Sequence, residues 1–310
     1  EISPRETILS RQLRMLSEAG VTEIVITTGP FDCVVEQYCK DLELPVSITF
    51  VKNPDYRETN YIYSIYLARE YLTGDILLLH GDLVLENAVL DAVLESGGSC
   101  AAVSSTVALP QKDFKAVLRD GLITKIGVEF FTDAVAAQPL YLLREKEWRV
   151  WLAEIAALCE AGEVKGYAEA AFNRVSAQCP LRPLDIRNML CAEVDNPEDL
   201  AVVSHRLREV ESRTVYMCFS TDMLHSGHIS IIRKAQRLGR LIVGVLSDEA
   251  VASYKRFPLL PFEERRAMFE SITGVYQVVE QRTLSYRENL EAYHPAYLVH
   301  GDDWVDGFQK

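Results

Sequence analysis

The sequence TVYMCFSTDMLHSGH, residues 214–228, decides the fold of the C-terminal part of the chain. Residues 215–219 are an apolar run that predicts a buried strand, residues 220–224 predict a turn, and a helix is expected from about Gly227 to Leu238. Parallel α/β sheets bind ligands at the carboxyl ends of their strands, beside helix N-termini whose free N–H groups attract phosphate. His225 and His228 fall at that place.

Two imidazoles at a helix N-terminus have a chemical use. They can donate hydrogen bonds to phosphate oxygens as charge develops during an in-line displacement, and nucleotidyl transfer needs such electrostatic help more than it needs a covalent nucleophile. Gly227 between them leaves room for a nucleotide to approach the backbone closely. For the motif alone, the other interpretation stays open: two surface histidines at the start of a helix.

Apolar runs predict further strands of the same part at residues 241–246 and 297–300. A polar, helical segment at residues 196–212 precedes the motif and separates it from an earlier series of strands and helices. We therefore expect two domains, residues 1–210 and residues 211–310.

The earlier series has the same alternating pattern. Amphipathic segments such as residues 6–19, which Gly20 ends, lie between short apolar runs. These runs predict strands at residues 23–27, 46–51, 76–79 and 100–103. Short apolar strands separated by helices favour an α/β fold of two Rossmann-like domains with mainly parallel sheets.

Composition limits the classes of function. The 310 residues are 48% hydrophobic and 25% charged, which is typical of a soluble globular protein. The net charge of −13 argues against a sequence-independent nucleic-acid binder, which needs a surplus of Lys and Arg. No apolar run approaches the roughly 18 residues of a membrane helix, and no signal peptide is visible. We expect a cytoplasmic protein without a nucleic-acid or membrane partner, and a homo-oligomer stays open.

Four blocks downstream of the histidines extend the pattern. They are Val243 to Glu249, Lys255, Pro261 to Arg266, and His300-Gly301-Asp302-Asp303-Trp304. Together with the His225 motif they resemble the cytidylyltransferase family that includes the glycerol-3-phosphate and phosphoethanolamine enzymes, over residues 214–310. Residues 252–256 and 283–286, with Asn289, resemble in particular the cytidylyltransferase domains fused to phosphoenolpyruvate mutases of phosphonate biosynthesis.

This resemblance implies roles for single residues. His225 and His228 contact the triphosphate and stabilise the transition state, and Lys255 and Arg265 bind phosphate or phosphonate oxygens. Gly227, Gly301, Asp302 and Trp304 belong to the nucleotide pocket. The other interpretation of Lys255 and Arg265 is a pair of solvated helix charges. The Ser/Thr-rich motif that follows the Gly-Asp-Asp-Trp block in the family does not occur before Lys310. Two explanations stay open: the natural polypeptide continues, by resemblance into a phosphoenolpyruvate mutase, or the site is incomplete.

A second candidate site lies in the N-terminal part. The apolar run at residues 76–79 delivers Asp82 at its carboxyl end, and a second acid, Asp195, follows much later. Two carboxylates from distant strands can hold Mg²⁺ on a nucleoside triphosphate. A single aspartate at the end of a strand is more often a turn or cap residue.

Residues 53–54, 59–64, 81–82, 112–115 and 193–195 resemble the sugar-nucleotidyltransferase superfamily, with a GT-A-like fold, over residues 1–205. The phosphocholine and aminoethylphosphonate cytidylyltransferases are its nearest branch. The resemblance implies that Asp82 and Asp195 hold the metal and that Asn60, Tyr63 and Lys115 lie near nucleotide or acceptor. The family's first strand and Gly-rich phosphate loop precede the segment that residues 1–7 resemble.

The expected activity is therefore the condensation of CTP with a small phosphonate or phosphate monoester, of the 2-aminoethyl- or 2-hydroxyethylphosphonate type, with Mg²⁺ as cofactor and pyrophosphate released. One alternative stays open: only the C-terminal module is catalytic, and the N-terminal module is a degenerate binding or scaffold domain. A Rossmann dehydrogenase is disfavoured because the chain contains no GxGxxG motif. The acidity argues against an aminoacyl-tRNA synthetase.

Overall fold

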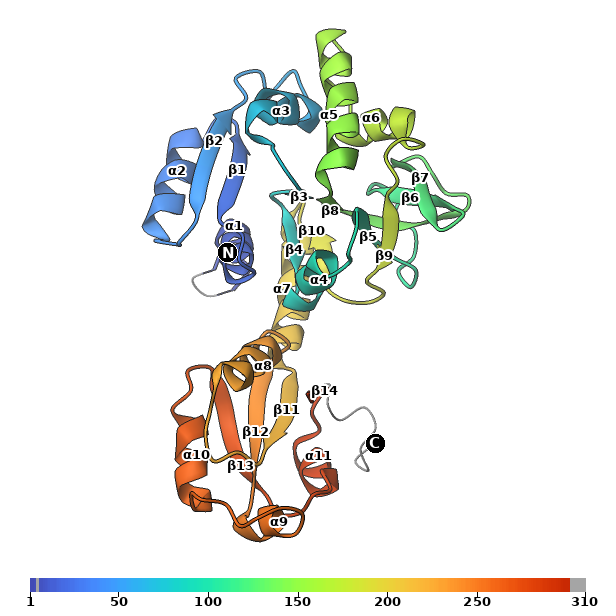
Figure 1. The fold of residues 1–310 in the computed structure, drawn as a ribbon. Coiled ribbons are helices and arrows are strands. Elements are labelled where there is room, and N and C mark those ends of the chain that lie inside the picture. The colour runs from blue at the N-terminus through green and yellow to red at the C-terminus, as the bar shows by residue number, and fades with distance from the viewer. Residues whose placement is uncertain (4–5, 302–310) are drawn as a thin grey trace. The chain divides into compact units, whose positions relative to one another are not determined.

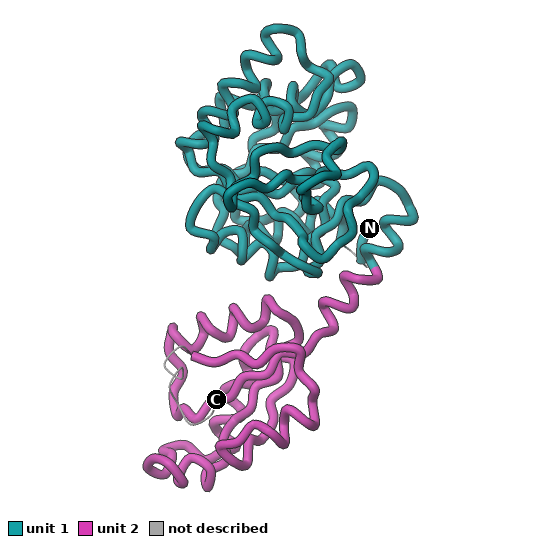
Figure 2. The backbone as a smooth tube through the Cα atoms, turned by 90° about the vertical axis from the view of Figure 1, so that its right-hand side faces the viewer, with its two compact units in different colours: residues 1–204 teal, residues 205–310 magenta. Residues whose placement is uncertain are grey.

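The computed structural model describes residues 1–3 and 6–301, and the chain divides into two compact units (Figures 1 and 2). The N-terminal unit comprises Glu1–Ser204 and the C-terminal unit His205–Lys310. The chain passes from one to the other within helix α7 (Pro197–Ser212), the helix expected at residues 196–212. Among the described residues, no helix is both long and apolar enough to cross a bilayer.

The N-terminal unit alternates helices and strands in its first half and gathers several strands in its second. Its helical segments are α1 (Ile8–Glu18), α2 (Asp32–Asp41), α3 (Tyr61–Ala68), η1 (Arg69–Tyr71), α4 (Asn87–Leu94), α5 (Glu145–Glu160) and α6 (Ala168–Val175). Its strands are β1 (Glu23–Thr28), β2 (Ser47–Lys52), β3 (Ile76–Leu79), β4 (Leu83–Leu85), β5 (Cys100–Ser104), β6 (Lys115–Arg119), β7 (Leu122–Gly127), β8 (Ala134–Leu143), β9 (Arg182–Asp185) and β10 (Cys191–Glu193). The four strands expected here are β1, β2, β3 and β5.

The expectation of mainly parallel sheets is wrong for the largest sheet of this unit. Strands β1 and β2 pair in parallel, but the six-stranded sheet runs in the order β7-β6-β8-β5-β9 with β3 also on β8, and within it only β5 and β9 are parallel. The tight turn at Asp120 and Gly121, both with positive φ, joins β6 to β7 as an antiparallel hairpin. Hairpins of this kind need no crossover helix, so the sheet is mixed.

The core of the N-terminal unit lies on both faces of that sheet. Successive residues of β5 point to opposite faces, so that Cys100 and Ala102 join one buried cluster while Ala101 and Val103 join the other. Helix α5 covers the face that carries Ala101 and Val103. Its Trp151 is fully buried and donates its indole N–H to the Ala168 carbonyl at 2.8 Å. This rigid sheet presents β3 and the turn after it to the pocket described below.

The C-terminal unit is a parallel sheet, as expected. In the part up to residue 301, four strands run in the order β13-β12-β11-β14, and their pairs are parallel. The strands are β11 (Thr214–Phe219), β12 (Arg240–Leu246), β13 (Val275–Gln281) and β14 (Tyr297–Leu298), and the helices are α8 (Ser226–Gln236), α9 (Asp248–Ala252), α10 (Phe262–Glu270) and α11 (Arg287–Tyr293). Val215 and Met217 pack with α8 and α10 on one face, and Tyr216 packs with α11 on the other. The carboxyl ends of these strands therefore lie at one edge of the sheet.

Candidate functional sites

The two histidines of the C-terminal unit lie where the sequence predicts them, after the carboxyl end of β11. His225 is the N-cap of α8, and its Nδ1 accepts a hydrogen bond from the Gly227 N–H at 3.1 Å. The rings of His225 and His228 stack with centroids 3.8 Å apart, and His228 packs edge-on against Phe219 at 5.4 Å. The two imidazoles are thus held as one pair at the positive end of a helix.

Gly227 has a geometric role within this pair. A Cβ atom at this position would lie 2.9 Å from Cε1 of His225 and 3.1 Å from its Nδ1. Any larger residue would push the His225 ring away from its stacked position on His228. The structure therefore gives a reason for glycine here that comes from the histidine ring itself.

His228 is prepared to act as a neutral imidazole. Partial burial lowers the pKa of His228, and the neighbouring His225 lowers it further, while the Met223 backbone acts in the opposite direction. Its Nδ1 is buried and has no hydrogen-bond partner among the described residues. This shift favours the neutral ring, and a neutral imidazole still carries one N–H that can donate a hydrogen bond to a phosphate oxygen.

Lys255 lies beside the same edge of the sheet. Its Nζ donates to the carbonyl of Ser220 at 2.8 Å and to Ser220 Oγ at 3.0 Å, and the hydroxyl of Tyr254 donates to the same Oγ at 2.7 Å. The Asp222 carboxylate accepts hydrogen bonds from the backbone N–H groups of Leu259 and Leu260, at 3.1 and 3.3 Å. The loop after α9 is therefore tied to the turn after β11, which places an exposed cation at the turn that leads to the histidine pair.

The resemblance implies that Arg265 binds phosphate or phosphonate oxygens, but the structure buries this side chain. It is fully buried, its Nη2 forms an ion pair with Asp248 Oδ1 at 2.6 Å, and its Nε donates to the Leu260 carbonyl at 3.1 Å. Its Nη1 is buried without a partner among the described residues. The side chain is neither a solvated charge nor accessible to a ligand in this conformation, because it joins α10 to the start of α9.

The predicted nucleotide pocket includes three residues near Lys310, of which Gly301 is described. Gly301 follows β14, and Asp302 and Trp304 lie outside the described residues. Asn289, which carried part of the resemblance, donates to the Tyr216 hydroxyl and to Gln281 Oε1, both at 2.8 Å. Asn289, which is half-buried, therefore supports the carboxyl end of β13.

The N-terminal unit contains a pocket of about 550 Å³. Helix α1 and strands β1 and β3 form an apolar wall, and the other end is polar. Among the residues predicted for this unit, Asn60, Asp82 and Asp195 line the pocket. The polar end also includes Tyr61, His80, Lys112, Asp113 and Glu193.

Two predicted residues do not line this pocket. Tyr63 stacks on Tyr66 at 5.9 Å and packs against the core. Lys115 is fully buried, and its Nζ donates to the carbonyl of Val128 and lies 4.1 Å from the centre of the Phe131 ring. Its ammonium group is therefore taken up inside the unit, and Lys112 is the cation that reaches the pocket.

The turn that carries Asp82 is held on both sides. The buried Gln12 donates from Nε2 to the carbonyls of His80 and Leu83, at 2.8 and 2.7 Å. Strand β10 pairs antiparallel with β4, which sets Glu193 opposite Leu83. The Val194 N–H then donates to the Asp82 carbonyl at 3.1 Å. This register brings Glu193, from a distant part of the chain, beside Asp82.

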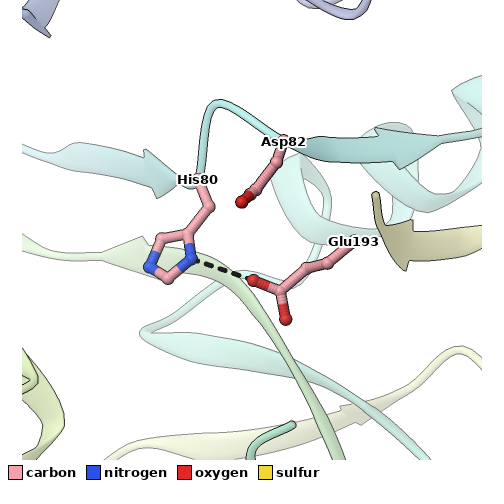
Figure 3. A group of neighbouring side chains, drawn as sticks. All are labelled: His80, Asp82 and Glu193. Carbon is pink, nitrogen blue, oxygen red and sulfur yellow. Dashed lines mark hydrogen bonds and ion pairs between the residues drawn. The ribbon is translucent and has the colours of Figure 1, made fainter. Parts of the chain in front are cut away.

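Three ligand-type side chains meet there, as Figure 3 shows: His80, Asp82 and Glu193, with ligand atoms within 4.8 Å of one another. His80 Nδ1 lies 3.1 Å from Glu193 Oε1, and Asp82 Oδ1 is buried without a hydrogen-bond partner among the described residues. Asp195 lines the pocket but is outside this group, and its N–H donates to Asp199. Sequence reasoning missed His80 and Glu193, although each lies within two residues of a predicted ligand.

Negative charge accumulates around His80. Burial acts to lower the pKa of His80, but the hydrogen bond to Glu193 and the charges of Glu169, Glu193 and Asp82 outweigh it, so the pKa is raised. Glu169 is almost fully buried, accepts a hydrogen bond from the Tyr141 hydroxyl at 2.7 Å and another from Tyr61, and burial raises its pKa. A cation is the kind of ligand that such surroundings favour.

Comparison with known proteins agrees with the geometry of the C-terminal unit. The cytidylyltransferase-like family model matches residues 218–310. The glycerol-3-phosphate cytidylyltransferase of Staphylococcus aureus is 33% identical over 89 residues, which are 28% of this chain and 67% of that protein. The chain belongs to the cytidylyltransferase-like family. This confirms the prediction of a cytidylyltransferase domain around His225 and His228.

Longer relatives of this cytidylyltransferase-like chain share only part of their length with it. An ethanolamine-phosphate cytidylyltransferase of Arabidopsis thaliana is 35% identical over 103 residues, 31% of this chain and 24% of that protein. A CMP-5'-(3-aminopropyl)phosphonate synthase of Streptomyces rubellomurinus is 30% identical over 203 residues, 62% of this chain and 32% of that protein. The chain thus spans about a quarter to a third of these relatives.

Solved structures extend the likeness to the other unit. The inositol-1-phosphate CTP transferase from T. maritima superposes with a TM-score of 0.53 at 18% identity, over 65% of this chain and 83% of that one. The CTP:phosphocholine cytidylyltransferase from Streptococcus pneumoniae gives 0.51 at 17%, over 66% and 87%. These matches cover more residues than the C-terminal unit contains, so they include part of the N-terminal unit. They establish a likeness of fold only.

Proposed function

We propose that the chain transfers the cytidylyl group of CTP to a small phosphonate or phosphate monoester. An oxygen of the acceptor attacks the α-phosphorus of CTP, the bond from that phosphorus to the bridging oxygen breaks, and pyrophosphate leaves with the electron pair. The observation that carries the proposal is the stacked pair of His225 and His228 at the N-terminus of α8. The family match and relatives that act on ethanolamine phosphate and make an aminopropylphosphonate conjugate support an acceptor of this class.

The residues divide the work by position. His228 donates a hydrogen bond to a phosphate oxygen on which charge develops, and the N-terminus of α8 adds its positive end. His225 fixes the position of His228 by stacking and caps the helix. Lys255 supplies a positive charge beside the turn that follows β11. Measurement of pyrophosphate release with different nucleotides and acceptors tests the proposal.

Lys255→Ala should raise the KM for the anionic substrate about tenfold, which corresponds to about 1.4 kcal/mol, and leave kcat nearly unchanged. The substitution removes one exposed cation that attracts the substrate and the transition state equally. Higher ionic strength should weaken binding in the parent protein and have less effect in the variant. Steady-state kinetics of both proteins measure this, with Arg233→Ala, in the last turn of α8, as the matched control. Equal KM values for all three proteins would make Lys255 a solvated charge.

We propose further that the pocket of the N-terminal unit binds a nucleotide with a divalent cation, for which the resemblance implies Mg²⁺. The unpartnered, buried Oδ1 of Asp82 and the neighbouring Glu193 fit such an ion. Lys112 and Asn60, on the polar side of the same pocket, are then placed to meet phosphate and sugar. The competing hypothesis is a scaffold domain without ligand.

Asp82→Asn should lower metal-dependent CTP affinity of the N-terminal unit at least about tenfold without unfolding it, because it removes one charge from the ion's ligands. Calorimetric titration of CTP with and without the metal measures the effect, in protein that also carries His228→Ala to suppress turnover. Asp133→Asn is the control, since Asp133 is exposed and its positive φ suits asparagine. Because His228→Ala leaves CTP binding in the C-terminal unit, the proposal predicts a second, metal-dependent binding event that Asp82→Asn weakens. A single binding event that is the same in both proteins favours the scaffold.

A further inference from the structure

The spacing of the three side chains after β3 suits a single metal ion. Two ligands of one ion, each bound at about 2.1 Å and at right angles, lie about 3 Å apart. His80 Nδ1 and Glu193 Oε1 are 3.1 Å apart, and the Asp82 carboxylate completes a group within 4.8 Å. In Figure 3 the Asp82 carboxylate points into the space beside the line that joins the other two. Small side-chain rotations bring all three to one centre.

The group is held by its surroundings before any ligand arrives. Tyr61 packs edge-on against the His80 ring at 4.7 Å and Phe114 does so at 6.2 Å, which keeps Nδ1 directed at Glu193. The side chains of His80 and Glu193 are only 19% and 17% exposed. A buried carboxylate oxygen without a partner is costly, and Asp82 Oδ1 is in that state. A cation between the three removes this cost.

We infer that His80, Asp82 and Glu193 form a metal site that prefers a first-row transition ion such as Mn²⁺ over Mg²⁺. The reason is the imidazole nitrogen, because Mg²⁺ takes oxygen ligands at nearly ideal octahedral geometry, whereas transition ions accept nitrogen readily. Two carboxylates alone would favour Mg²⁺. This inference rests on the proposed metal-dependent pocket of the N-terminal unit and is independent of catalysis at His228.

Binding of the metal alone tests the inference. We expect the full-length protein without nucleotide to bind Mn²⁺ at least about tenfold more tightly than Mg²⁺, as measured by calorimetry and by the loss of free Mn²⁺ signal in electron paramagnetic resonance. His80→Gln should lower the Mn²⁺ affinity about 10–100-fold, the loss that even outer-shell substitutions cause. Mg²⁺ affinity should change less, because Asp82 and Glu193 remain. His205→Gln makes the same chemical change at an exposed position and should leave both affinities unchanged.

Substitutions of Glu193 and Asp195 distinguish a metal ligand from a neighbouring carboxylate. Glu193→Gln should weaken Mn²⁺ binding as His80→Gln does, and Asp195→Asn, which removes a charge from the same pocket but no member of the group, should weaken it less. Thermal unfolding of each variant establishes that it is folded, and if His80→Gln does not fold, Glu193→Gln still decides. Equal affinity of the parent for Mn²⁺ and Mg²⁺, or full Mn²⁺ affinity in either variant, would overturn the inference. Pyrophosphate release, measured separately, reports on the proposed reaction whichever ion is preferred.

Discussion

His228→Ala should lower the rate of pyrophosphate release about 10²–10³-fold, or roughly 2.7–4 kcal/mol, while most of the CTP affinity remains. The ring of His228 is fixed by His225 and Phe219 before the reaction. A donor held in place costs no reorganisation when charge develops, so its loss falls on the transition state. The side chain is only partly buried and its Nδ1 has no partner among the described residues. The free energy of unfolding should therefore change by less than about 1 kcal/mol.

Single-turnover kinetics and thermal unfolding of the same preparations check both parts of this result. His225→Asn is an informative companion, because asparagine also caps helices well and keeps α8 intact while it removes the imidazole. His205→Ala, at an exposed position in α7, is the control. A large drop in melting temperature for His228→Ala would mark a structural residue, and an unchanged rate would remove the histidine pair from the mechanism.

Arg265→Met should destabilise the C-terminal unit by about 2–4 kcal/mol. The guanidinium is 0% exposed and its pair with Asp248 at 2.6 Å is the contact that joins α10 to α9. Removal of one partner leaves the other charge without compensation. Asp248 is 25% exposed, so water reduces the cost below that of a fully buried pair. Denaturant unfolding followed by a probe of the C-terminal unit measures the difference.

The adjacent Arg266 offers a matched control. It is half exposed and pairs with Glu270 one helical turn away at 2.7 Å. Arg266→Met should cost less than about 1 kcal/mol, as surface pairs do. If Arg265→Met unfolded at the parent's denaturant concentration but raised KM for CTP, Arg265 would be a ligand-binding residue after all, and its buried position would be one of two conformations.

Local patterns predicted β11, β12, β14 and α8 of the C-terminal unit, but not β13. An apolar run followed by a turn and a helix start can hardly form anything except β11, the turn and α8, and parallel pairing follows from helices between strands. The mixed sheet of the N-terminal unit is harder to predict from the sequence. Strand β8 contains three alanines and Pro139, which have low strand propensity, and only its partners on both edges make it a strand. The dipeptide Asp120-Gly121 is a sequence signal for the hairpin between β6 and β7.

The positions of charged side chains show where sequence reasoning ends. His225 and His228 lie at a helix start and Lys255 follows the end of α9, so their place follows from local structure. The burial of Arg265 depends on Asp248, which another element supplies. Glu193 and Asp195 are two residues apart, so a strand pattern puts both side chains on the same face. Only the register of β10 on β4 decides that Glu193 is the one that meets His80.

The release of pyrophosphate by the full-length protein tests the central claim most directly. CTP, ATP, GTP and UTP would each be supplied with 2-aminoethylphosphonate, 2-hydroxyethylphosphonate or phosphoethanolamine, with Mg²⁺ or Mn²⁺ present. We expect pyrophosphate from CTP alone among the nucleotides, only when an acceptor is present, and in equal amount with the CMP conjugate of that acceptor. Release that is as fast with ATP, or none with any acceptor in protein that is folded, would contradict the assignment of this chain as a cytidylyl transferase of small phosphonates and phosphate esters.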